Sequence, residues 1–216
     1  PQVRCAALGA VALLAAPGDV RALEVVLGCV KDVDEDVRCA AVRAVGEVAH
    51  KGDIGAVEKV LQHLMDSDED VRCVAAEVVG ELAFPDDENV IHALTQSLED
   101  TDPDVRAAAA TSLSNVHVVQ RPDTLLALAD TAKDEDESVR VAAVKALTSC
   151  AQSGSEVVWS VLGELLADDH ADIKCTAAHG LAQMATLDDV RAAGEISKLL
   201  LDVDEGVQDA AGEALG

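Results

Sequence analysis

The sequence predicts an all-α protein, a solenoid of antiparallel helix pairs, and two observations support this fold class. An aliphatic residue followed by a polar, usually basic residue recurs at a 34-residue step in seven copies: Val3-Arg4, Val37-Arg38, Val71-Arg72, Val105-Arg106, Val139-Arg140, Ile173-Lys174 and Val207-Gln208. Between these copies, apolar residues follow helical spacing. A period of this length indicates stacked supersecondary units, none of which can bury its apolar face alone.

Each repeat is predicted to be a helix, a turn and a second helix, as residues 32–65 illustrate. After an acidic turn, Val37, Ala41 and Val45 mark one face of the first helix. Gly52 interrupts the chain, and the second helix is expected from about Asp53 to Met65. The whole chain then holds about 13 helices in a single array, with repeats at residues 1–31, 32–65, 66–99, 100–133, 134–167, 168–201 and, in part, 202–216.

Two repeated positions of the first helix predict the core. Four residues after the repeated aliphatic residue, all seven repeats carry alanine: Ala7, Ala41, Ala75, Ala109, Ala143, Ala177 and Ala211. Such a column predicts a point where neighbouring helices pack too closely for a larger side chain. The next column, four residues on, is Val or Leu throughout, and we expect it to fill the interior.

The residue before the repeated aliphatic residue is predicted to cap the first helix. At this position stand Asp36, Asp70, Asp104, Ser138, Asp172 and Gly206. All are favoured N-cap residues, and an Asp or Ser there contributes about 1 kcal/mol.

The signature Asp-x-Asp-x-Asp-Val-Arg-x-Ala-Ala-x-x-Ala-Val/Leu-Gly, best carried by Asp32–Gly46 and Asp66–Gly80, resembles the HEAT repeat. It is closest to the short HEAT-like type of phycobilisome lyases, and the resemblance covers essentially the whole chain. It implies a right-handed superhelix whose concave side often binds other proteins. It also implies a structural ladder between repeats, formed by Arg38, Arg72, Arg106, Arg140 and Lys174 with the turn aspartates, Asp36, Asp70, Asp104 and Asp172 among them.

Charge and cysteine content limit the partners and the compartment. The net charge of −25 argues against nucleic acid and anionic membranes and favours a basic protein or peptide. Four of the six cysteines recur at one repeat position, too far apart for disulfides, which indicates free thiols in a reducing, cytoplasmic compartment. The chain begins inside a repeat without Met, so we expect a fragment of a longer protein.

The sequence offers no support for an enzyme, a cofactor or a metal site. The turn Asp32-x-Asp34-x-Asp36 imitates the start of a calcium-binding EF-hand loop, but Val37 stands where that loop requires glycine. The six histidines form no His-Glu pair, the mark of the HEAT-like metalloenzyme deoxyhypusine hydroxylase. Neither a nucleophile–base motif nor a phosphate-binding loop is present.

We therefore expect a non-enzymatic scaffold that binds a protein or peptide. The second helices are predicted to line the concave surface, and their exposed columns vary in chemistry, as suits an irregular partner. The candidate contact residues are Glu24, Glu58, Gln62, His92, Gln96, Leu126, Asp130, Glu164 and Lys198. Binding along the acidic edge, a lyase-like or chaperone-like role on a tetrapyrrole, and an engineered or recently duplicated array without a ligand remain open alternatives.

Two local features complete the expectations. The first helix carries Gly9 and Leu13 where other first helices carry polar pairs on their outer face, so we expect this apolar helix to be covered, for example by self-association. Trp159 is predicted to be a core residue packed against the small Ala193 of the next repeat.

Overall fold

A computed structural model describes residues 1–116, 121–150, 155–185 and 190–216. Within these ranges the chain is helical and contains no strand, which confirms the all-α prediction. The chain divides into two compact units, Pro1–Val116 and His117–Gly216. The handedness of the superhelix and the single array stay predictions.

Thirteen α-helices in the described ranges alternate between the first and second position of successive repeats. The first unit contains α1 (Gln2–Leu14), α2 (Val20–Cys29), α3 (Glu35–Val48), α4 (Ile54–Leu61), α5 (Glu69–Leu82), α6 (Glu88–Ser97) and α7 (Pro103–Asn115). The second unit contains α8 (Pro122–Thr131), α9 (Glu137–Cys150), α10 (Glu156–Leu165), α11 (Ala171–Met184), α12 (Val190–Ile196) and α13 (Glu205–Leu215). Short 3₁₀ helices, η1 (Gln62–Met65) and η2 (Ser197–Leu201), extend α4 and α12.

The first helices begin two residues earlier than predicted. The N-cap of α3 is Asp34, whose carboxylate accepts a hydrogen bond from the Val37 amide at 3.3 Å. The same role falls to Asp68, Asp102 and Asp204 in α5, α7 and α13. The predicted caps Asp36, Asp70, Asp104 and Asp172 instead lie in the first turn, as do Ser138 and Gly206. The apolar pattern could not reveal this first turn of the helix, because the residues of the turn are polar or small.

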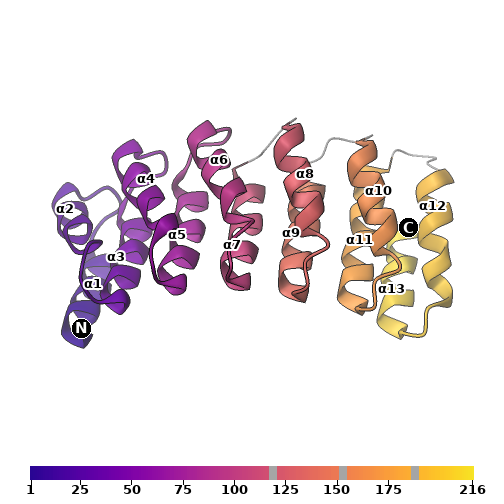
Figure 1. Ribbon diagram of the computed structural model, residues 1–216, viewed down its shortest axis with the longest axis horizontal. Coiled ribbons are helices and arrows are strands. Elements are labelled where there is room, and N and C mark those ends of the chain that lie inside the picture. Colours follow the sequence, from indigo (N-terminus) through magenta and orange to yellow (C-terminus); the bar gives the residue numbers. More distant parts are fainter. Residues whose placement is uncertain (117–120, 151–154, 186–189) are drawn as a thin grey trace. The chain divides into compact units, whose positions relative to one another are not determined.

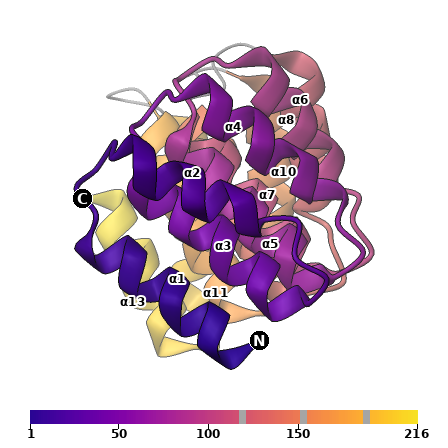
Figure 2. The same cartoon turned by 90° about the vertical axis from the view of Figure 1, so that its left-hand side faces the viewer.

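Within the first unit, the first helices form the more tightly packed layer. Successive helices α1, α3, α5 and α7 pack directly on one another, whereas α2, α4 and α6 pack mainly on the first helices (Figures 1 and 2). The alanine column explains the close approach, because Ala41, Ala75 and Ala109 are completely buried. The prediction that the second helices line the concave surface stays a prediction.

A backbone hydrogen bond joins neighbouring repeats in the first unit at a constant position. The amides of Gly18 and Gly52 donate to the carbonyls of Val48 and Leu82, each at 2.6 Å. Asp86 makes the equivalent bond to Val116 at 3.0 Å. All three donors have a positive φ, +79° and +82° for the glycines and 63° for Asp86, so the turn favours glycine.

The basic residue of each repeat links two repeats through the start of the next acidic turn. Arg38 forms a bidentate pair with Asp66 at 2.9 and 2.7 Å, and Arg72 does the same with Asp100 at 2.8 Å. Arg38 also donates to the carbonyl of Asp32 in its own turn at 3.1 Å. The acceptors therefore differ from the predicted Asp36, Asp70, Asp104 and Asp172. A side chain in the first turn of a helix leans toward the helix N-terminus, which directs it to the beginning of the neighbouring turn.

The ladder continues in modified form in the second unit. Lys174 pairs with Asp202 at 2.8 Å, and Gln208 donates to the carbonyl of Asp202 at 2.7 Å. Arg140 lies 3.4 Å from Asp168 and donates to the His170 ring at 2.7 Å. In the first unit, Arg106 donates to the carbonyl of Asp100 at 2.9 Å.

The two local expectations have different outcomes. Trp159 is buried, as predicted, but the Arg191 guanidinium lies 5.0 Å above its ring, while Ala193 is exposed. On α1, Leu13 and Leu14 are 84% and 86% exposed, so nothing in the structure covers them.

Candidate partner-binding groove

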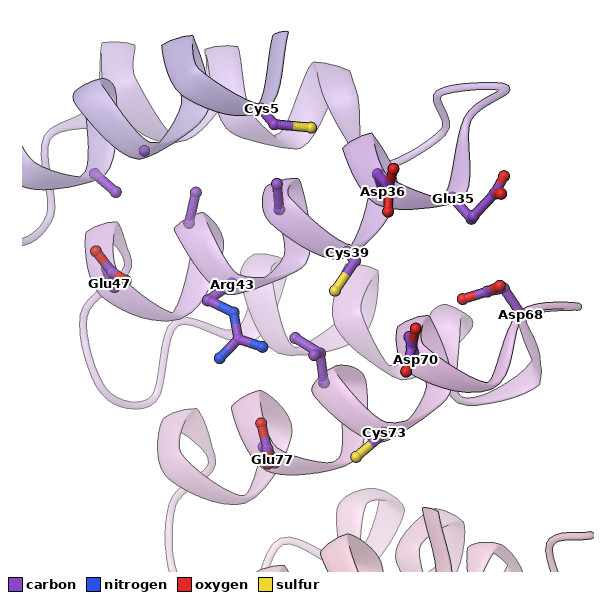
Figure 3. Close-up of a pocket in the computed structure, with 15 residues that line it drawn as sticks. Cys5, Glu35, Asp36, Cys39, Arg43, Glu47, Asp68, Asp70, Cys73 and Glu77 are labelled. Atoms are coloured by element: carbon purple, nitrogen blue, oxygen red, sulfur yellow. The ribbon is translucent and has the colours of Figure 1, made fainter. Parts of the chain in front are cut away.

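The first helices of the first unit line a groove of about 440 Å³ across α1, α3 and α5 (Figure 3). On α3 its lining residues include Asp36, Ala40, Arg43 and Glu47, spaced so that they share one face of the helix. Small residues of α1 and α3 supply apolar surface between the polar side chains, among them Gly9, Ala12, Ala40 and Ala44. A second hollow of about 610 Å³ continues the groove across α5 and α7 and shares lining residues with the first: Asp70, Cys73 and Glu77. We call the two together the acidic groove.

Carboxylates dominate the lining of the acidic groove. Eight line it, namely Glu35, Asp36, Glu47, Asp68, Asp70, Glu77, Glu81 and Asp104. The only basic residue among the lining residues is Arg43, on the α1–α5 side. The surface therefore attracts cations and repels anions.

Two cysteines of the acidic groove, Cys39 and Cys73, have raised pKa values and are protonated thiols at neutral pH. Burial raises the pKa of Cys73 to about 11, and the negative charges of Glu77 and Asp104 add to this effect. Burial also raises the pKa of Cys39, although the neighbouring Arg43 partly offsets it. No histidine lines the acidic groove, so these two thiols lack the imidazole base that typically activates a nucleophilic cysteine.

Free thiols are found at all five cysteines whose side chains are described: Cys5, Cys29, Cys39, Cys73 and Cys175. This confirms the prediction of unpaired, half-buried thiols for the repeated position. The side chain of Cys150 lies outside the description.

The nine residues predicted to contact a partner are all exposed, but they lie elsewhere. They project from the second-helix segments, and none lines the acidic groove. Glu164 alone borders a further hollow of about 270 Å³ beside Trp159 and Arg191. The groove instead contains Asp36, Asp70 and Asp104, which the sequence had suggested as ladder residues.

The signal that could have located the groove was the alanine column itself. It shows that the first helices approach one another most closely. The polar pairs Arg43–Glu47 and Glu77–Glu81 of these helices line the groove.

The described residues contain neither a metal-binding cluster nor a membrane-spanning helix. No group of three or more His, Cys, Asp or Glu side chains there is arranged to hold a metal ion. No helix in that part of the chain is both long enough and apolar enough to cross a membrane.

Family models place the repeats in a known class. The model described as HEAT repeats matches residues 57–147, 91–182 and 123–216, and a single HEAT repeat matches residues 22–51. The chain belongs to the HEAT repeat family. No curated protein gives a significant match.

Solved structures with similar folds are other α-solenoids. An engineered protein is 25% identical, with a TM-score of 0.67, over 89% of this chain and 96% of that one. A designed armadillo repeat protein in complex with the peptide (KR)4 is 21% identical, with a TM-score of 0.65, over 90% and 99% of the two chains. The YibA protein of Escherichia coli is 22% identical, with a TM-score of 0.65, over 89% and 69%. These matches establish the fold of a HEAT-type repeat scaffold.

Proposed function

We propose that this HEAT repeat protein is a non-enzymatic scaffold that docks an extended, basic segment of a partner protein in the acidic groove. The observation that carries the proposal is the excess of carboxylates over Arg43 along a continuous hollow of the first unit. Cationic side chains on the partner would pair with these carboxylates, and its aliphatic parts would cover the small residues between them. The thiols of Cys39 and Cys73, whose pKa values are raised, suit such a passive role.

The dimensions of the acidic groove favour an extended occupant. Neighbouring helices in such stacks lie roughly 8–10 Å apart, so the path from α1 to α7 covers about 30 Å. An extended chain advances about 3.3 Å per residue and would span this path with about nine residues. The designed armadillo repeat protein with the bound peptide (KR)4 is a precedent for basic peptides on a related fold, although its low identity extends only to the fold.

Of the alternatives, a tetrapyrrole ligand is disfavoured by charge. Such ligands carry propionate carboxylates, which the carboxylates of the acidic groove would repel. An array without a ligand is disfavoured by the groove columns, which change from repeat to repeat: Gly9, Arg43, Glu77 and Thr111 occupy equivalent positions. The cytoplasmic location and self-association through α1 stay proposals, supported by the free thiols and by exposed Leu13 and Leu14.

The test is binding of a fluorescent ten-residue peptide of alternating Lys and Arg, measured by anisotropy at two salt concentrations. We expect saturable binding that weakens with salt. The double variant Glu77→Lys/Glu81→Lys should weaken it at least about tenfold, which corresponds to roughly 1.4 kcal/mol. The matched control, Glu24→Lys/Glu58→Lys, makes the same charge change on the second helices and should have a much smaller effect.

Thiol footprinting supplies an independent readout of the bound face. Bound peptide should slow the alkylation of Cys73, which lines the acidic groove, without slowing that of Cys29 on α2. If the second-helix variants abolish binding instead, the partner face is the one that the sequence predicted. If wild type does not bind the peptide, the proposal is wrong.

A further inference from the structure

The single basic residue of the acidic groove is in an unusual situation. Six carboxylates line the α1–α5 part of the groove with Arg43, yet Arg43 forms no ion pair with any of these lining residues. Figure 3 shows its guanidinium extending from α3 toward α5, where Cys73 and Glu77 lie. The Cys39 thiol is a polar neighbour of this guanidinium. The planar, charged fork of Arg43 is therefore available to a ligand.

The two halves of the acidic groove differ because of this residue. The α5–α7 half is lined by Asp70, Glu77, Glu81 and Asp104 and by no basic side chain. The α1–α5 half combines carboxylates with Arg43 and with small apolar residues. A uniformly basic segment fits the α5–α7 half, but in the α1–α5 half it brings positive charge close to Arg43. A guanidinium binds a carboxylate in bidentate fashion, so a segment with one acidic residue at that place satisfies both halves.

We propose that Arg43 is the specificity-determining residue of the acidic groove and binds a carboxylate of the docked segment. The preferred segment is bipartite, with basic residues on α5 and α7 and an acidic residue, or the carboxyl terminus of the chain, over α3. Arg43 thereby fixes both the position and the direction of the segment. This inference rests on the proposed function, because it assigns the charge pattern of the same occupant.

The experiment compares three labelled ten-residue peptides that share one basic half of alternating Lys and Gln. In the first peptide, the other half contains only Gln. In the second, the other half is N-terminal and has one Glu at the N-terminal end. In the third, the other half is C-terminal and has one Glu at the C-terminal end. All have blocked termini. Wild type should bind one of the Glu peptides about three- to fivefold more tightly than the Gln peptide, the range expected for one exposed ion pair. The Glu peptide that binds more tightly identifies the direction of the bound segment.

The variants are Arg43→Gln and, as a matched control, Lys145→Gln in the full chain. Lys145 is exposed and occupies the equivalent position of α9 in the second unit, so both substitutions remove one positive charge at the same repeat position. Arg43→Gln should bind the Gln peptide more tightly than wild type does and should lose the preference for Glu. Lys145→Gln should keep the wild-type order of the three peptides. Circular dichroism would verify that both variants are folded.

The outcomes separate the two proposals. If basic peptides bind but Arg43→Gln keeps the wild-type preference, or wild type shows no preference for either Glu peptide, the assignment of Arg43 is wrong and the groove remains a basic-segment site. If none of the peptides, nor the Lys-Arg peptide, binds to wild type, the proposed function fails and the role of Arg43 fails with it.

Discussion

The capping aspartates show how one repeated turn divides its carboxylates among different tasks. Asp34 accepts from the Val37 amide and begins α3, whereas Asp32 receives Arg4 at 2.9 Å and the Asp34 amide at 3.1 Å. Asp36 belongs to neither set and faces the acidic groove. Three aspartates at alternate positions therefore serve the link between repeats, the helix start and the lining of the acidic groove.

This division predicts different consequences for two neighbouring substitutions. Asp34→Ala should lower the free energy of unfolding by about 1 kcal/mol, because the Val37 amide loses its acceptor. Asp36→Ala should change it by less than about 0.5 kcal/mol, because the exposed Asp36 carboxylate does not cap the helix. Urea denaturation followed by circular dichroism measures both. A larger loss of unfolding free energy for Asp36→Ala than for Asp34→Ala would show that Asp36 is the N-cap, as the sequence suggested.

The residue types of the turn were readable from the sequence, but their division of labour was not. All three aspartates are favourable near a helix N-terminus, and the apolar pattern starts only at Val37. Which of them is the cap depends on where the chain enters the helix. The sequence did identify Arg38 as a link to a neighbouring turn, and it missed only the acceptor, Asp66.

At the scale of helices and turns, the glycine turn between paired helices holds adjacent repeats together. Gly52 needs its positive φ to donate to Leu82, and a methyl group added there would overlap the Phe84 ring. The sequence predicted the interruption at Gly52 because glycine breaks helices. It could not predict the bond to the next repeat, which depends on how α3 and α5 stack.

Replacement of this glycine should loosen the junction between two repeats. Gly52→Ala is expected to cost about 1–2 kcal/mol for the left-handed backbone, before any displacement of Phe84. The control Gly55→Ala lies in α4, where an added methyl group meets only Asp53 Oδ1 at 3.4 Å, and should stabilise the protein by about 0.5 kcal/mol. Hydrogen exchange of the Gly52 amide and of α4 reports both effects. Equal protection in the two variants would contradict the strained turn.

The number of helices in the described ranges agrees with the sequence prediction, whereas the groove is lined by the first helices and not by the predicted contact residues. Helical spacing and capping residues give thirteen helices, because both are local properties of the chain. Which layer carries a groove depends on the distances between repeats, and exposed columns such as Glu24 and Glu58 carry no information about them. The buried alanine column indicates the close approach of the first helices, through the small size of its side chains.

At the scale of the whole molecule, the structural ladder makes stability depend on pH, because its contribution is lost in acid. Burial opposes the ionisation of Asp66, but hydrogen bonds from Arg38, the Asp68 amide and His63 outweigh it and lower its pKa to about 2. The pKa values of Asp100 and Asp168 are also lowered, against burial, by hydrogen bonds from Arg72 and from the amide and ring of His170 respectively. A carboxylate with a depressed pKa stabilises the fold above its unfolded pKa, and this contribution is lost as the pH falls toward the folded value.

The acid dependence can be assigned to one residue by comparison of variants. Asp66→Asn should lose about 2 kcal/mol at neutral pH, the equivalent of the shift from 3.8 to about 2. The difference in free energy of unfolding between Asp66→Asn and wild type should shrink as the pH falls from about 4 to 2. Over this range Asp66 of the wild type becomes protonated and loses its charge as well. Asp36→Asn, which lacks the Arg38 pair, should show no comparable trend. A pH-independent difference for Asp66→Asn in urea titrations would contradict the account.

The links between repeats also determine how such a chain can change in length. Each Arg–Asp pair and each turn amide bond in the first unit joins only consecutive repeats, and the donors and acceptors recur at the same 34-residue step. Excision or duplication of one full period there rejoins an equivalent donor to an equivalent acceptor. A deletion shorter than one period leaves the donor without its acceptor and the acceptor without its donor. Evolution can therefore lengthen or trim this protein in whole modules, and each module gained or lost changes the number of side-chain positions along the acidic groove by one row.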